Sequence, residues 1–162
     1  EITLPEFDSA NDFEGLRNFS AGLKEIPKLN YLSIAFRQED IRDEEFNHLT
    51  SNLQDCTSLK SLHLNFCQTG KLIDNVIRYC ANRMSKLLSL KELKIQFWGE
   101  KEFTQQLIFE LLDNLTVIKG LEVLVLNLSR NTTIPSWSKE LLKYPIMLRR
   151  LKIFVFNNIT VV

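Results

Sequence analysis

The chain has 162 residues, enough for one domain with its own hydrophobic core. Hydrophobic residues make up 44% and charged residues 25%, which is ordinary for a globular protein, and 20 basic residues balance 20 acidic ones. A chain without net charge has no global attraction for nucleic acid or an anionic membrane, and no apolar run reaches the ~18 residues that span a bilayer. We therefore expect neither nucleic acid nor a membrane as a partner.

One strand pattern returns along the whole chain. Five complete strands follow the pattern Leu-x-x-Leu-x-(Leu/Ile)-x-apolar, and their leading residues, at steps of 30, 31, 31 and 27, are Leu29, Leu59, Leu90, Leu121 and Leu148. A partial strand is predicted at the start of the chain, because Ile2 and Leu4 precede Leu32 and Ile34 of the first complete strand by one such step. Alternation of apolar and variable residues predicts one buried and one open face for each strand.

Between the strands the apolar period changes from 2 to about 3.6. Apolar residues recur 3, 6, 10 and 13 positions before the leading leucines, which predicts helices over 12–24, 43–55, 73–88, 102–118 and 137–144. Three residues before the leading leucines stand Ile26, Cys56, Leu87 and Ile118, and these residues are predicted to face inward. The last unit departs from the pattern, because Pro135 and Pro145 replace apolar residues and shorten its helix.

These elements make each unit a strand, a loop, a helix and a second loop. Strands joined by a helical crossover are parallel, and the crossover is right-handed. One unit cannot bury its own apolar face, so the units must stack into a continuous core. The chain ends after the apolar string 153–156 and 159–162 without a polar cap, and it starts at Glu1 rather than Met. We therefore expect a fragment of a longer array, or a partner that covers the C-terminal end.

The segment Cys56-Thr-Ser-Leu-Lys-Ser-Leu-His-Leu-Asn-Phe-Cys67 resembles the leucine-rich repeat, and the long units, each with a full helix, are similar to its ribonuclease-inhibitor-like class. The resemblance implies an α/β fold: a leucine-rich-repeat solenoid shaped as a curved right-handed βα horseshoe, with a parallel sheet on the concave face and helices on the convex face. It implies one domain over 1–162 with about five repeats and a partial first one. The sequence differs from the family pattern at the position that is usually asparagine. In the other units this position holds Arg37, Trp98, Ser129 and Phe156.

The same resemblance implies a scaffold that binds proteins through its concave face. Residues between the buried leucines would line that face, and aromatic residues and arginine there are typical of binding hot spots. The candidate partner-binding residues are Tyr31, Arg37, His63, Lys94, Trp98, Val125, Arg150, Lys152, Phe154 and Phe156. Trp98, Val125, Phe154 and Phe156 are predicted to form one apolar patch, unless a further segment covers the two phenylalanines.

Catalytic patterns are missing from the sequence. It has no P-loop, Gly-x-Gly-x-x-Gly, His-Glu-x-x-His or Gly-x-Ser-x-Gly. His63 and Cys67 lie on one extended strand roughly 13 Å apart, too far for proton transfer. The other histidine, His48, is predicted on an exposed helix face, and three cysteines at irregular spacing favour reduced thiols. We expect no enzyme activity, no cofactor, no metal and no small-molecule substrate.

The leading hypothesis is a non-catalytic interaction or structural scaffold module, located in the cytoplasm, whose protein partners belong to a large assembly. One alternative is a substrate receptor of a ubiquitin ligase or a regulator of a small GTPase; in the GTPase regulator, Arg37 would be the acting residue. A second alternative is an extracellular recognition domain. A glycan on the sequon at Asn131 would favour this alternative.

Overall fold

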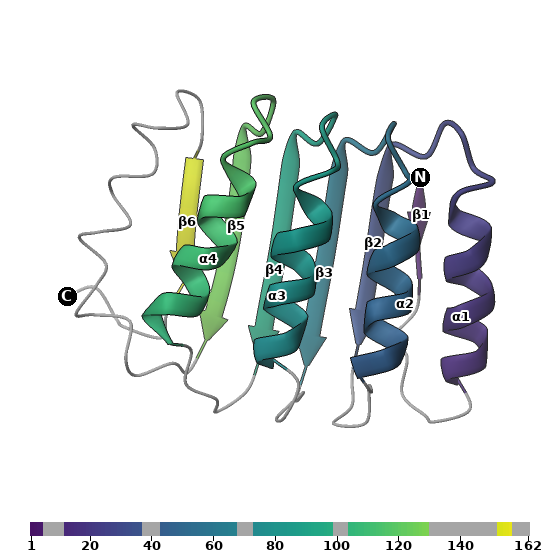
Figure 1. Ribbon diagram of the computed structural model, residues 1–162, viewed down its shortest axis with the longest axis horizontal. Coiled ribbons are helices and arrows are strands. Elements are labelled where there is room, and N and C mark those ends of the chain that lie inside the picture. Colours follow the sequence, from purple (N-terminus) through teal and green to yellow (C-terminus); the bar gives the residue numbers. More distant parts are fainter. Residues whose placement is uncertain (5–11, 37–42, 68–72, 99–103, 130–151, 157–162) are drawn as a thin grey trace.

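A computed structural model describes residues 1–4, 12–36, 43–67, 73–98, 104–129 and 152–156. The strands are β1 (Ile2–Thr3), β2 (Tyr31–Phe36), β3 (Ser61–Cys67), β4 (Glu92–Trp98), β5 (Val123–Ser129) and β6 (Lys152–Phe156). The helices are α1 (Asp12–Leu23), α2 (Asp43–Leu53), α3 (Ile73–Met84) and α4 (Gln105–Leu115). From β1 to β5, strands and helices alternate along the chain, and β6 is the last described element (Figure 1).

The six strands form one sheet in the order of the chain, β1-β2-β3-β4-β5-β6, and every neighbouring pair is parallel. Figure 1 shows the four helices side by side on one face of this sheet. The predicted α/β class, with parallel strands alternating with helices, is confirmed, as is the partial first strand. The predicted helix over 137–144 lies outside the described residues.

The core fills the space between the sheet and the helices. Within β2 the burial alternates at every residue, and the inward side chains of Leu32, Ile34 and Phe36 are fully buried. The parallel register places each inward residue beside its equivalent in the next unit, so Ile34 pairs with Leu64 and Leu64 with Ile95. Leucines and isoleucines of neighbouring units therefore share one continuous core, as the sequence pattern predicted.

A ladder of aromatic rings extends this core across three units. Phe36, Phe66 and Phe97 stack with centroids 5.1 Å apart at each step and planes nearly parallel. Phe46 of α2 meets Phe66 edge-on, with ring centroids 5.5 Å apart. Offset stacks and edge-to-face contacts are the favoured arrangements of aromatic pairs. The ladder joins helix and sheet at the end of the strands.

Each helix returns to the sheet through a short turn, and each turn after the first is hydrogen-bonded to the turn before it. The amides of Lys60 and Ser61 both donate to the carbonyl of Asn30, at 2.9 and 3.0 Å, and the amides of the next two turns repeat the arrangement on Lys60 and Lys91. The helices end three to four residues before the predicted ends at 88 and 118, because the chain leaves the helix to make this turn. At the N-terminal end of α4, the Thr104 side chain accepts a hydrogen bond from the amide of Leu107 and so caps the helix.

Ile26 corrects one sequence prediction. Cys56, Leu87 and Ile118 occupy the predicted inward position and are buried, whereas Ile26 is 38% exposed. It stands three residues after the end of α1, in the turn, and the residue at the equivalent position in the next unit is the small Cys56. A cysteine thiol is too short to cover the isoleucine side chain, so a pocket stays open between the side chains of the first two turns, although their backbones are hydrogen-bonded.

Candidate functional site on the open face of the sheet

The sheet face opposite the helices, here called the open face, carries the variable residues of the strands. Among the described residues no helix covers it (Figure 1). Its side chains are half-buried, apart from the buried Asn127, and they form rows that run across the strands. The rows are Tyr31, Ser61, Glu92 and Val123; then Ser33, His63, Lys94 and Val125; then Ala35, Asn65, Gln96 and Asn127.

A polar cluster stands at the centre of the open face. The Tyr31 hydroxyl lies 3.2 Å from Nδ1 of His63, and the two rings meet edge-on with centroids 5.0 Å apart. Nε2 of His63 lies 3.5 Å from Oε1 of Glu92. Glu92 also pairs with Nζ of Lys94 at 2.5 Å and accepts a hydrogen bond from Oγ of Ser61 at 3.2 Å. Three strands thus contribute to one connected network.

The surroundings of His63 favour its neutral form. Partial burial lowers the pKa of the imidazole below its ordinary value of 6.5, and the Lys94 ammonium lowers it further, while Glu92 opposes both effects. In the neutral ring, a proton on Nε2 avoids repulsion between a nitrogen lone pair and the Glu92 carboxylate, and Tyr31 then donates to Nδ1. Nε2 is buried and makes no hydrogen bond with any described residue, so its proton is held only by the longer contact to Glu92.

Glu92 is the negatively charged member of the cluster. The hydrogen bond from Lys94 is the main reason why the pKa of its carboxyl lies below the ordinary range; partial burial opposes this, and His63 and Ser61 add to it. The charges of Glu92 and Lys94 therefore compensate each other on the open face. The result is a pre-ordered polar surface with little net charge.

The arrangement does not resemble that of a nucleophile and its base. The Ser61 hydroxyl donates to Glu92, and the partner of the His63 ring is Tyr31. An activated serine would need its hydroxyl within hydrogen-bond reach of the imidazole. Within the described ranges, no group of three or more His, Cys, Asp or Glu side chains could hold a metal ion.

Of the ten residues predicted to bind a partner, the structure describes the side chains of some and only the backbone of others. Tyr31, His63, Lys94 and Val125 are half-buried on the open face, and the first three belong to the cluster. Trp98 ends β4, and its side chain is not among those described. Arg37 and Arg150 lie outside the described residues.

The other three predicted residues belong to β6, of which the structure describes the backbone. The register places Lys152 beside Val123, Phe154 beside Val125 and Phe156 beside Asn127, so the predicted rows continue onto β6. Trp98 pairs with Ser129, one row further along. The register is compatible with the predicted apolar patch around Val125, and whether it binds a partner stays a prediction.

Two members of the cluster, Glu92 and Ser61, were not singled out from the sequence. The signal was available, because Glu92 follows Ser61 by one step of the repeat and the two polar residues are therefore neighbours in one row. His48 corrects another prediction. It is half-buried rather than exposed, with Nδ1 2.9 Å from Nδ2 of Asn52, which in turn donates to Ser20 of α1 at 2.8 Å.

His63 gives the chain a pH dependence with a definite sign. Because its folded-state pKa lies below 6.5, the unfolded chain binds more protons than the folded chain as the pH falls through that value, and stability is lost. We expect the free energy of unfolding to decrease between about pH 7 and about pH 5, and to decrease less in His63→Gln. Urea denaturation at both pH values measures this, while an NMR titration giving His63 a pKa above 6.5 would contradict it.

Known proteins are similar to this chain at the level of the fold. No protein-family model matches the chain, and no curated protein sequence matches it. Among solved structures, that of "Leiomodin-1 Actin-Binding Site 2 (ABS2)" is similar, with a TM-score of 0.58 and 17% sequence identity, over 90% of this chain and 79% of that chain. At this identity the likeness concerns the fold alone. None of the described helices combines the length and apolar character needed to cross a membrane.

Proposed function

We propose that this chain is a leucine-rich-repeat module that binds a protein partner through the open face of its sheet, which would be the concave face of a solenoid. The observation that carries the proposal is the set of in-register, half-buried rows across β2–β5, with no helix over them among the described residues. A face of this kind is pre-organised by the sheet beneath it, so a partner meets side chains that are already ordered.

The composition of the face supports a protein rather than a nucleic acid or a small molecule. Among the side chains that the structure describes on this face, the charged pair Glu92 and Lys94 is internally compensated and leaves no excess of positive charge for a phosphate backbone. Tyr31, Val123 and Val125 offer apolar area beside polar groups, which is the usual mixture at protein interfaces. The commitment of Ser61 to Glu92 supports a non-catalytic role.

Affinity capture with matched variants tests this function. The chain and its variants Tyr31→Ala, Lys94→Ala and Val125→Ala are immobilised, exposed to an extract of the native source, and the bound proteins are identified by mass spectrometry. We expect proteins that wild type retains and at least one open-face variant loses, since truncating a hot-spot side chain costs about tenfold or more in affinity.

The matched control is Arg78→Ala on α3, whose side chain is 62% exposed on the helix side. It should retain the same proteins as wild type. If no captured protein distinguishes the open-face variants from wild type and control, the proposed function is wrong.

The similar solved structure is named as an actin-binding site, so purified actin is the first single protein to test. The ubiquitin-ligase and GTPase-regulator alternatives stay predictions, as does the extracellular one, because Arg37 and Asn131 lie outside the described residues. The free, buried thiols of Cys56 and Cys80 support the proposed location in a reducing compartment such as the cytoplasm.

A further inference from the structure

Four turns lead from the helices back into the sheet, and they lie together along one edge of the molecule (Figure 1). They comprise residues 24–30, 54–60, 85–91 and 116–122 and are here called the turn edge. The carbonyl of one turn accepts amides of the next, which holds neighbouring turns side by side. Side chains on the turn edge therefore have fixed neighbours, although they come from distant parts of the sequence.

Lysine is concentrated on the turn edge. All six lysines of these turns are exposed, against three carboxylates, so the edge carries three excess positive charges on a chain whose total charge is zero; the lysines are Lys24, Lys28, Lys60, Lys86, Lys91 and Lys119. Only Lys91 is neutralised within the described part of the chain, by Glu122 at 2.9 Å. Lys86 bonds the uncharged Gln54, at 2.9 Å. The other four form no ion pair with a described residue.

Exposed aliphatic side chains lie among these lysines. Leu88 in the third turn is 67% exposed and Val117 in the fourth is 50% exposed. A single exposed aliphatic residue is ordinary on a protein surface. Here two of them share an edge with unneutralised lysines, a combination that offers both charge and apolar contact.

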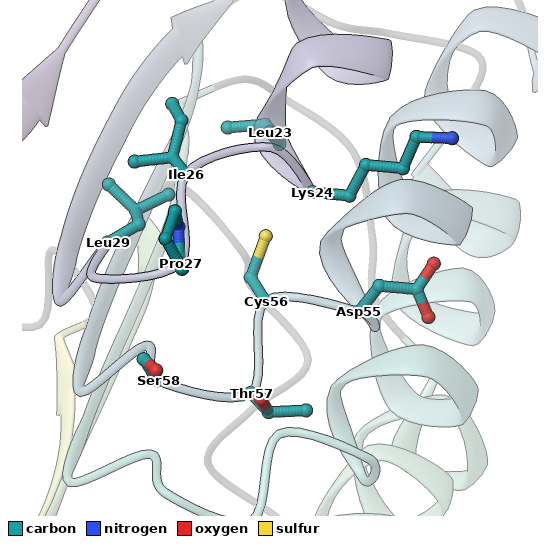
Figure 2. Close-up of a pocket in the computed structure, with 9 residues that line it drawn as sticks. All are labelled: Leu23, Lys24, Ile26, Pro27, Leu29, Asp55, Cys56, Thr57 and Ser58. Atoms are coloured by element: carbon teal, nitrogen blue, oxygen red, sulfur yellow. The ribbon is translucent and has the colours of Figure 1, made fainter.

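The first two turns enclose a pocket of about 210 Å³. Its apolar lining comes from Leu23 at the end of α1, from Ile26, Pro27 and Leu29 of the first turn, and from Cys56 of the second turn (Figure 2). Its polar lining comes from Lys24, Asp55, Thr57 and Ser58. The pocket exists because Cys56 stands where the later units have the larger Leu87 and Ile118, which are buried. Burial, and to a lesser degree Asp55, raises the pKa of the Cys56 thiol, so the thiol stays uncharged and belongs to the apolar part of the lining.

We propose that the turn edge docks an acidic segment of a protein partner, with one aliphatic side chain of that segment in the pocket beside Cys56. The excess lysine charge complements carboxylates, and the aliphatic side chains Ile26, Leu88 and Val117 complement apolar residues between them. An anionic bilayer would also attract the lysines, but a layer of headgroups has no side chain to enter a recess between two turns. The pocket therefore favours a protein segment. This surface differs from the open face and does not depend on its function.

A displayed library of random peptides, each of roughly ten residues so as to cross all four turns, tests the proposal without knowledge of the natural partner. The whole chain is the target. We expect the enriched peptides to be rich in Asp and Glu around at least one aliphatic residue. A synthetic peptide of the enriched sequence should bind less tightly as salt is added, because the exposed charges are screened.

Two groups of variants then locate the binding. Lys28→Gln/Lys119→Gln should weaken binding of the synthetic peptide about tenfold or more. The control Arg17→Gln/Arg78→Gln, which removes as many charges from the helices, should change the affinity by less than about twofold. Cys56→Leu should fill the pocket and weaken binding of the peptide. Cys56→Ala should leave the pocket open and preserve that binding. Cys56→Val serves as a second filling variant if leucine prevents folding, which thermal melting reports.

The proposal is overturned if the enriched peptides show no acidic bias, if the lysine variant binds them as well as wild type, or if pocket filling has no effect. It is also overturned if vesicles containing phosphatidylserine bind in a lysine-dependent manner while Cys56→Leu changes nothing, because a membrane would then be the partner. Lys94→Ala must bind the peptide normally. That control separates this surface from the open face, whose own test can fail independently.

Discussion

Leu64→Asp is expected to abolish folding. Leu64 is 1% exposed in the middle of β3, and its register partners are Ile34 on one side and Ile95 on the other. A carboxylate there would be surrounded by aliphatic side chains, where an unpaired charge costs several kcal/mol. The total stability of a domain is only about 5–15 kcal/mol, so this one substitution is comparable with all of it.

Far-ultraviolet circular dichroism and urea denaturation measure the effect. Gln96→Glu is the matched control, because it introduces a carboxylate on the same sheet at a half-buried position of the open face. We expect the control to fold and to unfold near the wild-type urea concentration. A folded Leu64→Asp protein with a normal melting curve would show that the inward assignment of the leucines is wrong.

Phe66→Ala should cause the second largest loss. The Phe66 ring stacks on Phe36 and on Phe97, with centroids 5.1 Å away on each side, and meets Phe46 edge-on. It is 1% exposed, so its truncation leaves a cavity that joins three repeat units and one helix. Phenylalanine-to-alanine changes of this kind cost about 3–5 kcal/mol.

The midpoint of urea unfolding measures this loss, and Phe66→Leu is its control. Leucine keeps most of the buried volume but not the stacked ring, so we expect Phe66→Leu to lose clearly less stability than Phe66→Ala. Equal stability of the alanine variant and wild type would mean that the aromatic ladder contributes nothing to the joining of the units.

The pattern of leucines predicted the sheet because it repeats at a nearly constant step. Such a step places equivalent side chains in register, as Leu62 with Leu93 and Leu93 with Leu124. The prediction depends only on the periods of strand and helix and on the need of each unit to bury its apolar face. The helix ends were less accurate, since the turn that returns to the sheet continues the apolar spacing of the helix before it.

The candidate site was predicted as a face but not as a network. Tyr31, His63 and Lys94 were expected on the open face because they alternate with buried residues. Their connection through Glu92 depends on side-chain conformations. The His63 ring tilts toward Tyr31, and the Glu92 carboxylate contacts His63 of the neighbouring strand as well as Lys94 of its own strand. Sequence spacing places the Cα atoms of such residues in neighbouring rows of one face and says nothing about the direction of the side chains.

The sequence by itself determined the order and direction of the strands and the side chains that each strand buries, because a fixed repeat length and two local periods leave one way to stack the units. Only the tertiary structure decided that Cys56 leaves a pocket beside an exposed Ile26, and that His63 lies between Tyr31 and Glu92. Both depend on the volume and orientation of side chains across neighbouring units, and these are fixed only when the units pack against one another.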